Sequence, residues 1–488
     1  MPRPIHPGVI PIQNFNLSGL AFSKWSGRKD SLYKIIGFDP HSQPGLLNVE
    51  QKLTAETTGV EPTEFCRVAV NSSNGAQYWF SYTSGKIWER PTTGTWRLVH
   101  TTTPAAGTAG CFGAKEYQGY IYWATQSRLH RITVANADNN DWATDAVEDW
   151  ATFTITDSAF HPFLNHTGQQ ILYIGDGNYL AQVDAGTFTA NALDIVTPLR
   201  IKSLGQIGTD ILLGTYIADN ITQTEIIRWN GWGVSFTNSD PIPEVGINAF
   251  LPADNMVLVQ AGTKGNIYYY DGTSLELWSK IPGEYSSTAT GEVYPDSVAN
   301  KEGQILLGFS NITGNSTNQL VYRIARHSRN FDYILDAPYP ISERSGSDFV
   351  LTGLNIGAIL VVGSDIYVAW KNTAGAGTYG VDRLDSATKL SGAYFETRVA
   401  VINREEFANF SEALIAYASL PTGTGVDFYI DKNYSGYSSV LSKVADTDRN
   451  IIRTKDESTE FTTLQLKVKV TTSSNLAPQI ESGAIIIR

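Results

Sequence analysis

Two histidines and one acidic stretch come closest to the residue types and spacing that metal chemistry requires. His161 and His166 are too far apart to share one helical metal-binding face, and Pro162 lies between them. We interpret them as turn and core histidines. Residues 134–152 are rich in Asn and Asp, whose oxygens can hold calcium at alternate positions, but Trp142 interrupts the alternation and the central glycine of a calcium loop is missing. The sequence therefore predicts a solvated acidic loop, with no metal site and no cofactor.

The common catalytic motifs are missing from the chain. There is no phosphate-binding loop, no Gly-x-Ser-x-Gly elbow, no Cys-x-x-Cys pair and no repeated Ser-x-Asp-x-Gly-x-Thr-Trp box of the sialidase kind. Paired carboxylates could still meet at the centre of a ring-shaped fold and cleave glycosides. We predict that the protein is not an enzyme and has no catalytic residue, and we keep glycan cleavage as an alternative.

Tryptophans are abundant and allow two interpretations. Aromatic platforms on loops bind sugars, which would make the protein a lectin. Recurrence at similar places in a repeated unit instead favours packing between units. The residues concerned are Trp79, Trp88, Trp123, Trp229, Trp232, Trp278 and Trp370.

The element that must position these residues is a repeated β-meander. In residues 256–281, three apolar or aromatic stretches are separated by Ala261-Gly262 and by Asp271-Gly272, a dipeptide that suits a tight hairpin turn. Similar pairs of strands are predicted at 77–80 with 85–88, 119–123 with 128–132, 171–175 with 179–183, 211–215 with 225–229, 304–308 with 320–324, and 365–370 with 379–384. A spacing of roughly 40 to 60 residues is typical of propeller blades.

These repeats predict an all-β fold with a β-propeller of about seven blades, six to eight being compatible with the pattern. A stacked β-sandwich is the alternative. Short helices are expected only at 30–36 and 404–407. From Ser391 the alternation becomes longer and cleaner, which predicts a C-terminal antiparallel β-sandwich or jelly roll.

Three parts are therefore expected along the chain. Residues 1–60 form an N-terminal extended arm and a latch strand, with Leu46 to Val49 as the strand that could close the ring. A loose leader is the alternative, mainly for residues 1–12. Residues 61–390 form the propeller and residues 391–488 the C-terminal domain.

Composition excludes several classes of protein. A formal net charge of −12 argues against binding nucleic acid through its phosphates and against anionic membranes. No apolar run is long enough to span a bilayer, and the first residues lack the apolar core of a signal peptide, so we expect synthesis in the cytoplasm without Sec-type export. Cys66 and Cys111 are interpreted as two buried thiols.

Four stretches carry a resemblance to a known family. Residues 391–399, 463–472 and 477–484 look like the C-terminal β-domain of bacteriophage tail proteins, and residues 37–54 are similar to the opening of phage structural proteins that continue into a propeller. The order of arm, propeller and terminal β-domain resembles the tail nozzle or hub proteins of short-tailed phages. This resemblance carries no functional residue over, because the family shares a layout and not a catalytic motif.

The resemblance implies a virion structural protein of the tail, made in the host cytoplasm and forming an oligomeric ring around the DNA conduit. Its expected partners are other copies of itself, neighbouring tail or neck proteins and, in one reading, a host-surface glycan. An acidic lumen would let DNA slide. Lys467 and Lys469 lie on the polar face of a predicted strand and are our predicted assembly contacts. The alternatives are a receptor- or glycan-binding propeller, with or without cleavage, and a cytoplasmic propeller scaffold.

Overall fold

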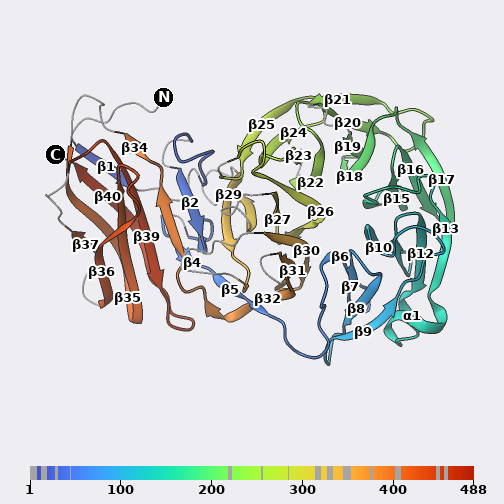
Figure 1. Cartoon of the computed structure of the whole chain (residues 1–488), viewed down its shortest axis with the longest axis horizontal. Helices are drawn as coiled ribbons and strands as arrows, with labels where there is room; N and C mark the ends of the chain where they lie inside the picture. The colour runs from blue at the N-terminus through green and yellow to red at the C-terminus, as the bar shows by residue number, and fades with distance from the viewer. Residues whose placement is uncertain are drawn as a thin grey trace.

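A computed structural model describes residues 8–487 apart from 13–18, 28–30, 44, 218–222, 254–255, 284, 314–319, 327–332, 344–352, 374–376, 402–407, 447–450 and 455–459. Strands dominate it, which confirms the all-β prediction. Seven four-stranded antiparallel meanders stand around an axis, with a second group of strands beside them (Figure 1). The predicted helix at 30–36 is wrong where the structure describes it, because β2 (Leu32–Ile36) is a strand. The helix predicted at 404–407 lies outside the described residues.

Each meander contributes four strands in order from the axis outward. The inner strands are β6 (Cys66–Asn71), β10 (Gly113–Tyr117), β14 (Phe163–His166), β18 (Arg200–Ile207), β22 (Ile247–Ala253), β26 (Thr290–Lys301) and β30 (Leu354–Val362). The second strands are β7 (Gln77–Ser81), β11 (Tyr120–Ala124), β15 (Ile171–Asp176), β19 (Asp210–Tyr216), β23 (Met256–Ala261), β27 (Gln304–Thr313) and β31 (Asp365–Asn372).

The third strands are β8 (Lys86–Arg90), β12 (Arg128–Thr133), β16 (Tyr179–Asp184), β20 (Thr224–Trp229), β24 (Asn266–Tyr270), β28 (Val321–Arg326) and β32 (Thr378–Lys389). The outer strands are β9 (Arg97–Thr101), β13 (Val147–Thr152), β17 (Thr187–Asp194), β21 (Asn238–Ile242), β25 (Leu275–Lys280), β29 (Tyr333–Tyr339) and β5 (Gln51–Ala55). All seven hairpins predicted from the sequence coincide with a second and third strand. Six meanders are sheets of their own, while β26–β29 takes its place in the ring and also continues into a larger sheet.

Local chemistry explains the hairpins. At the turn between β24 and β25, Gly272 has φ +92°, and the Asp271 carboxylate accepts the Thr273 and Ser274 backbone N–H groups at 2.8 Å each. Only glycine adopts that φ without strain, and an aspartate bonded to the next backbone donors fixes the turn.

The predicted acidic loop at 134–152 is instead folded. It holds two short helices, α1 (Val134–Asp138) and α2 (Trp142–Asp145), followed by β13. Thr133 caps α1 by accepting the Asn136 N–H at 3.2 Å. Trp142 is fully buried, with its ring 5.6 Å from that of Trp123. The residue that interrupts the calcium pattern is thus an anchor of the hydrophobic core.

A strand from the N-terminal segment completes the seventh meander. β5 pairs antiparallel with β32, placing Leu53 opposite Leu384 and burying its side chain. The expected strand at Leu46 to Val49 is observed as β4 (Asn48–Val49), which pairs with β3 (Phe38–Asp39) and not with the ring. The strand that joins the ring is therefore the next one along the chain.

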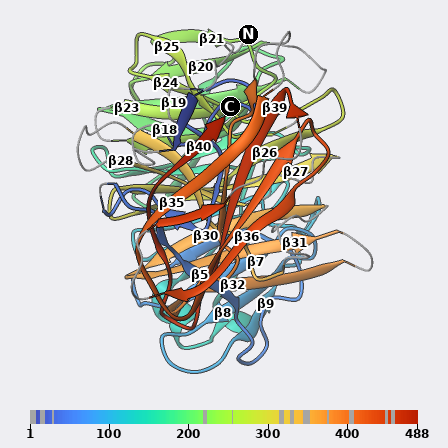
Figure 2. The same cartoon turned by 90° about the vertical axis from the view of Figure 1, so that its left-hand side faces the viewer.

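Beside the ring, a 14-stranded sheet holds the sixth meander together with strands from both chain ends (Figure 2). Its further members are β1 (Gly8–Ile12), β2, β33 (Tyr394–Thr397), β34 (Ala400–Val401), β35 (Ala408–Lys432), β36 (Ser438–Asp446), β37 (Ile451–Thr454), β38 (Glu460–Phe461), β39 (Thr463–Thr471) and β40 (Gln479–Ile487). β33 pairs with β2, and β40 pairs with β1. The predicted C-terminal sandwich is not confirmed, because these strands share one hydrogen-bonded path with N-terminal strands and with the sixth meander. The division at residues 60 and 390 stays a prediction.

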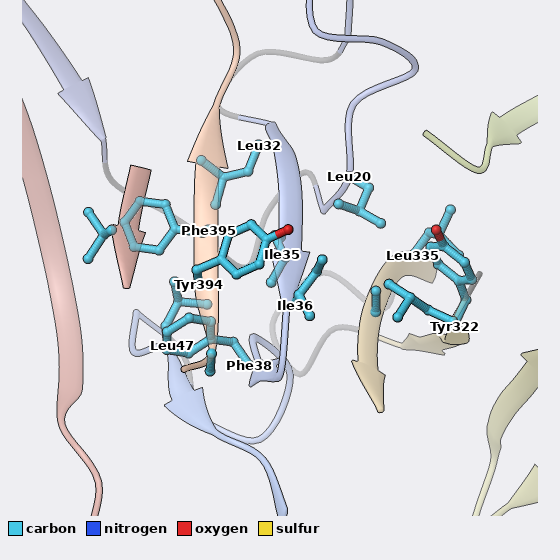
Figure 3. Packing of buried hydrophobic residues seen from close by; sticks show 14 of the residues in the cluster. Leu20, Leu32, Ile35, Ile36, Phe38, Leu47, Tyr322, Leu335, Tyr394 and Phe395 are labelled. Carbon is cyan, nitrogen blue, oxygen red and sulfur yellow. The ribbon is translucent and has the colours of Figure 1, made fainter. Parts of the chain in front are cut away.

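Within this sheet, an apolar cluster packs the terminal strands against the sixth meander (Figure 3). Ile35 and Ile36 of β2 are buried in it, with the Phe38 and Phe395 rings 6.2 Å apart on one side and Leu335 on the other. Each such side chain stabilises the fold by about 1.5–3 kcal/mol when fully buried.

One buried ion cluster, the Arg323 hub, reinforces the junction. Arg323 of β28 is 2% exposed and contacts Asp336 at 2.7 Å, Glu50 at 2.6 Å and Asp39 at 3.2 Å. His41 lies 3.1 Å from the same Asp336. Three of these five residues come from the N-terminal segment, so the hub fastens that segment to the ring.

Candidate functional site

An irregularity in β26 shapes the centre of the ring. Val293 pairs with Phe309 and Val298 with Leu307, so residues 294–297 stand opposite Gly308 alone. Pro295 lacks the N–H that a regular ladder needs, which favours such a bulge. β26 also contacts β6 and β18, its next-but-one neighbours in the ring. The bulge therefore lies across the centre of the ring.

Arg67 of β6 faces this bulge. Its guanidinium carbon lies 4.0 Å from the ring centroid of Tyr294, 4.3 Å from that of Tyr82 and 5.5 Å from that of Phe160. Arg67 is 9% exposed. Cation–π contact of this kind is worth up to about 2 kcal/mol when desolvated. Burial raises the pKa of Tyr294 to about 12 although Arg67 acts to lower it, so the phenol is neutral.

Lys202 of β18 is the second buried cation. Its Nζ lies 2.5 Å from Glu292 Oε2 and donates to Asn248 Oδ1 at 2.7 Å. The Asn248 amide in turn donates to Gln260 at 2.8 Å. Phe160 lies against the ammonium group, with 5.0 Å between Nζ and the ring centroid. The charge of Lys202 is therefore neutralised within the protein.

Aromatic rings gather at the end of the ring where the inner strands begin. The Tyr82 and Phe112 centroids are 5.5 Å apart, and so are those of Phe160 and Tyr216. Phe112 and Phe160 precede inner strands, while Tyr82 follows β7 and Tyr216 ends β19. All are only partly buried, as is Tyr294. We call Tyr82, Phe112, Phe160, Tyr216 and Tyr294 the aromatic mouth.

Asp296 lies on the same bulge. Burial raises its pKa to about 6, and the charges of Lys115 and Arg67 only partly oppose this effect. No cation of the described residues comes within ion-pair distance of it.

At the other end of the inner strands there is a polar cavity of about 510 Å³. Glu116 accepts the Ser72 O–H at 2.6 Å and the Ser73 N–H at 2.8 Å, and Asn165 donates to the Glu116 backbone carbonyl at 2.9 Å. The Asn165 Oδ1 atom is buried without a hydrogen-bond partner in the described part of the chain. Lys115 lines the cavity and is exposed.

The predicted assembly residue Lys467 is not on an exposed face. It is 4% exposed and lies 4.3 Å from the Tyr394 ring centroid, 5.3 Å from that of Tyr437 and 3.9 Å from Glu396 Oε1. The expectation that Lys467 lies on an exposed polar face is wrong, because these groups cover that face of β39. Lys469 is partly exposed, and its assembly role stays a prediction.

Other expectations are settled by burial. His161 lies between the carbonyls of Gly175 and Gln126, at 2.7 and 3.0 Å, which confirms it as a core histidine. His166 is likewise buried, 3.0 Å from the Thr209 carbonyl.

Cys66 and Cys111 are free and buried, as interpreted. Of the tryptophans, Trp79, Trp88, Trp123, Trp229 and Trp370 are buried between or within blades, whereas Trp232 is 80% exposed.

Sequence reasoning missed Arg67, Lys202 and the bulge. The available signals were a charged residue inside the apolar run Cys66-Arg67-Val68 and the pair Pro295-Asp296, which comes shortly before the predicted strand at 304–308.

Comparison with known proteins gives fold-level likeness only. No protein-family model matches the chain, and no curated protein matches it by sequence. The extracellular domain of a hybrid two component system from B. thetaiotaomicron is similar at 14% identity with a TM-score of 0.47, over 82% of this chain and 47% of its own. This chain thus spans about half of that domain. Virginiamycin B lyase from Staphylococcus aureus is similar at 12% identity with a TM-score of 0.47, over 69% of this chain and 99% of its own. Exo-β-1,3-galactanase from Phanerochaete chrysosporium is similar at 9% identity with a TM-score of 0.28, over 69% and 99%. Within the described ranges, no helix is long and apolar enough to cross a membrane.

Proposed function

We propose that this propeller protein binds carbohydrate at its aromatic mouth and does not cleave it. The observation that carries the proposal is the set of partly exposed rings, from four meanders and the bulge of a fifth, that gather around two cationic side chains. Sugar rings stack their C–H faces on aromatic rings, while charged groups bond the hydroxyls.

Cleavage is not part of the proposal. Glycoside hydrolysis needs two carboxylates free to act as acid and as base or nucleophile. Glu292 is occupied by Lys202 at 2.5 Å. The protein should therefore bind glycans without releasing reducing sugar.

A glycan array followed by calorimetry on the best ligand tests this function. Phe160→Ala and Tyr82→Ala should each weaken binding at least tenfold, since losing a stacked aromatic anchor costs about 1.4 kcal/mol or more. Trp232→Ala is the matched control because it removes an exposed aromatic side chain from another loop. If no glycan binds, or if Trp232→Ala is the harmful variant, the aromatic mouth is not the site.

The virion tail component expected from the sequence is a second proposal. The layout favours it: the propeller stands at one end and the terminal strands at the other, with β2 between them (Figure 1). Such a body can contact neighbours through its terminal sheet while the propeller faces a host glycan. Negative-stain micrographs of the purified protein should then show closed rings, and monodisperse single particles at every concentration would count against this reading.

A further inference from the structure

Arg67 is a buried cation without a counter-ion. It is 9% exposed, and no carboxylate among the described residues lies within ion-pair distance of it. Lys202, the other cation of the aromatic mouth, is paired with Glu292. Burying an unpaired charge is costly, so such groups are normally paired or bind a ligand.

The contacts of Arg67 leave its hydrogen-bonding edge unused. Tyr82 and Tyr294 lie at 4.3 and 4.0 Å from the guanidinium carbon, distances typical of rings over its faces. The N–H donors of a guanidinium point outward in its plane and form a fork that matches a carboxylate with two parallel hydrogen bonds. No described residue accepts from that fork.

We propose that Arg67 binds the carboxylate of an acidic sugar, of the uronic or sialic acid class, whose ring packs on the aromatic mouth. This inference rests on the proposed carbohydrate binding and adds the ligand class. Phe160 lies within reach of both cations, 5.5 Å from Arg67 and 5.0 Å from Lys202, and is placed to stack with the sugar. The positive charge of Lys202 is already balanced by the Glu292 carboxylate, so Lys202 supplies polar contacts and no net charge.

Asp296 does not fill the role of counter-ion. The two side chains are not within ion-pair distance of each other, and although Arg67 acts to lower the pKa of Asp296, burial still raises it to about 6. A ligand carboxylate bonded to the fork would supply the missing anion.

The test compares acids with their own methyl esters. Calorimetry is run with 3′-sialyllactose and with trigalacturonic acid, each beside its methyl ester, which keeps the sugar and removes the charge. A sulfated disaccharide is included to separate carboxylate from sulfate recognition. The protein variants are Arg67→Gln, Arg67→Lys and, as control, Arg383→Gln, whose side chain is 42% exposed on an outer region of the ring.

We expect the wild type to bind at least one acid tenfold or more tightly than its ester. Arg67→Gln should remove that preference, Arg67→Lys should keep a smaller part of it because the charge stays but the fork is lost, and Arg383→Gln should keep it within twofold. Equal binding of acid and ester, a preference for the sulfated sugar alone, or a preference that survives in Arg67→Gln overturns the inference and leaves carbohydrate binding standing. A glycan array on which nothing binds overturns both. If Arg67→Gln fails to fold, Arg67→Lys takes its place: an acid preference that Arg67→Lys leaves unchanged overturns the inference, and so does equal binding of acid and ester by the wild type.

Discussion

Pro295 and Asp296 stand where a regular inner strand would pair, and this places a carboxylate at the centre of the ring. The groups that act on Asp296 are Lys115 of β10 and Arg67 of β6, while the buried Cys111 thiol lies near enough for the carboxylate to raise its pKa further. Burial outweighs the two cations, and the carboxyl group therefore binds its proton more tightly in the folded chain than in the unfolded one.

Replacing Asp296 should change stability in a pH-dependent way. Its folded pKa of about 6 lies above the ordinary 3.8, so the stabilisation that it contributes as a neutral acid is complete below pH 3.8 and is lost as pH rises through about 6. Asp296→Asn should therefore melt at a higher temperature than the wild type at pH 8, by a few degrees, and at the same temperature at pH 4. Melting curves across this range check it, with Asp145→Asn on the surface as control. A difference in melting temperature that does not vary with pH would contradict this reading.

Residues of this kind could not be found from the sequence. Arg67 and Tyr294 come from different blades, and a single chain carries no local sign that two inner strands will bring them together. The tryptophans were noticed, but their abundance did not distinguish Trp123, which packs in the core, from Trp232, which is exposed, and Phe160 was not singled out.

At the scale of elements, the Arg323 hub decides how the N-terminal segment is held. Although burial acts to raise the pKa of Asp39, Arg323 together with local hydrogen bonds holds it below its ordinary value. The three carboxylates depend on one guanidinium that is 2% exposed.

Arg323→Met should therefore destabilise the protein strongly, by about 3–5 kcal/mol, because it leaves buried carboxylates without their cation. Arg383→Met breaks the ion pair with Asp365, in which the nitrogen and oxygen atoms are 2.8 Å apart and the arginine side chain is 42% exposed. Its loss should lower the free energy of unfolding by at most about 1 kcal/mol. Urea unfolding of both variants provides the measurement. Equal losses would mean that the hub contributes no more than a surface ion pair.

Hairpins were predictable because their signals are local. Strand alternation and turn pairs such as Asp271-Gly272 located every second and third strand. The terminal strands were recognised as strands from the alternation around Leu464 to Val470, but the alternation did not reveal that Lys467 would be covered as well. Covering that face depends on Tyr394 and Glu396, which are distant in sequence.

At the scale of the whole molecule, the ring is completed by β5, which is synthesised long before its partner strand β32. Leu53→Ala should cost about 2–5 kcal/mol and expose the seventh meander, since the side chain is buried against Leu384 and the other apolar residues of that blade. The exposed Thr54→Ala should change stability by less than about 0.5 kcal/mol. Limited proteolysis with mass mapping is the measurement: new cleavage within β32 is expected only in Leu53→Ala. Cleavage confined to other blades would show that β5 does not secure the ring.

The pairing of β5 with β32 also sets a waiting time during synthesis. Ala55 leaves the ribosome well before β32 (Thr378–Lys389) exists, and at 5–20 residues per second the delay is on the order of tens of seconds. Throughout that interval β5 has no strand to pair with, so its edges are free, while the earlier meanders are made one after another as an open arc. Free edges of this kind pair readily with other chains. Slow translation or missing chaperones should therefore reduce the yield of soluble protein more than a comparable change would for a propeller closed by strands made together.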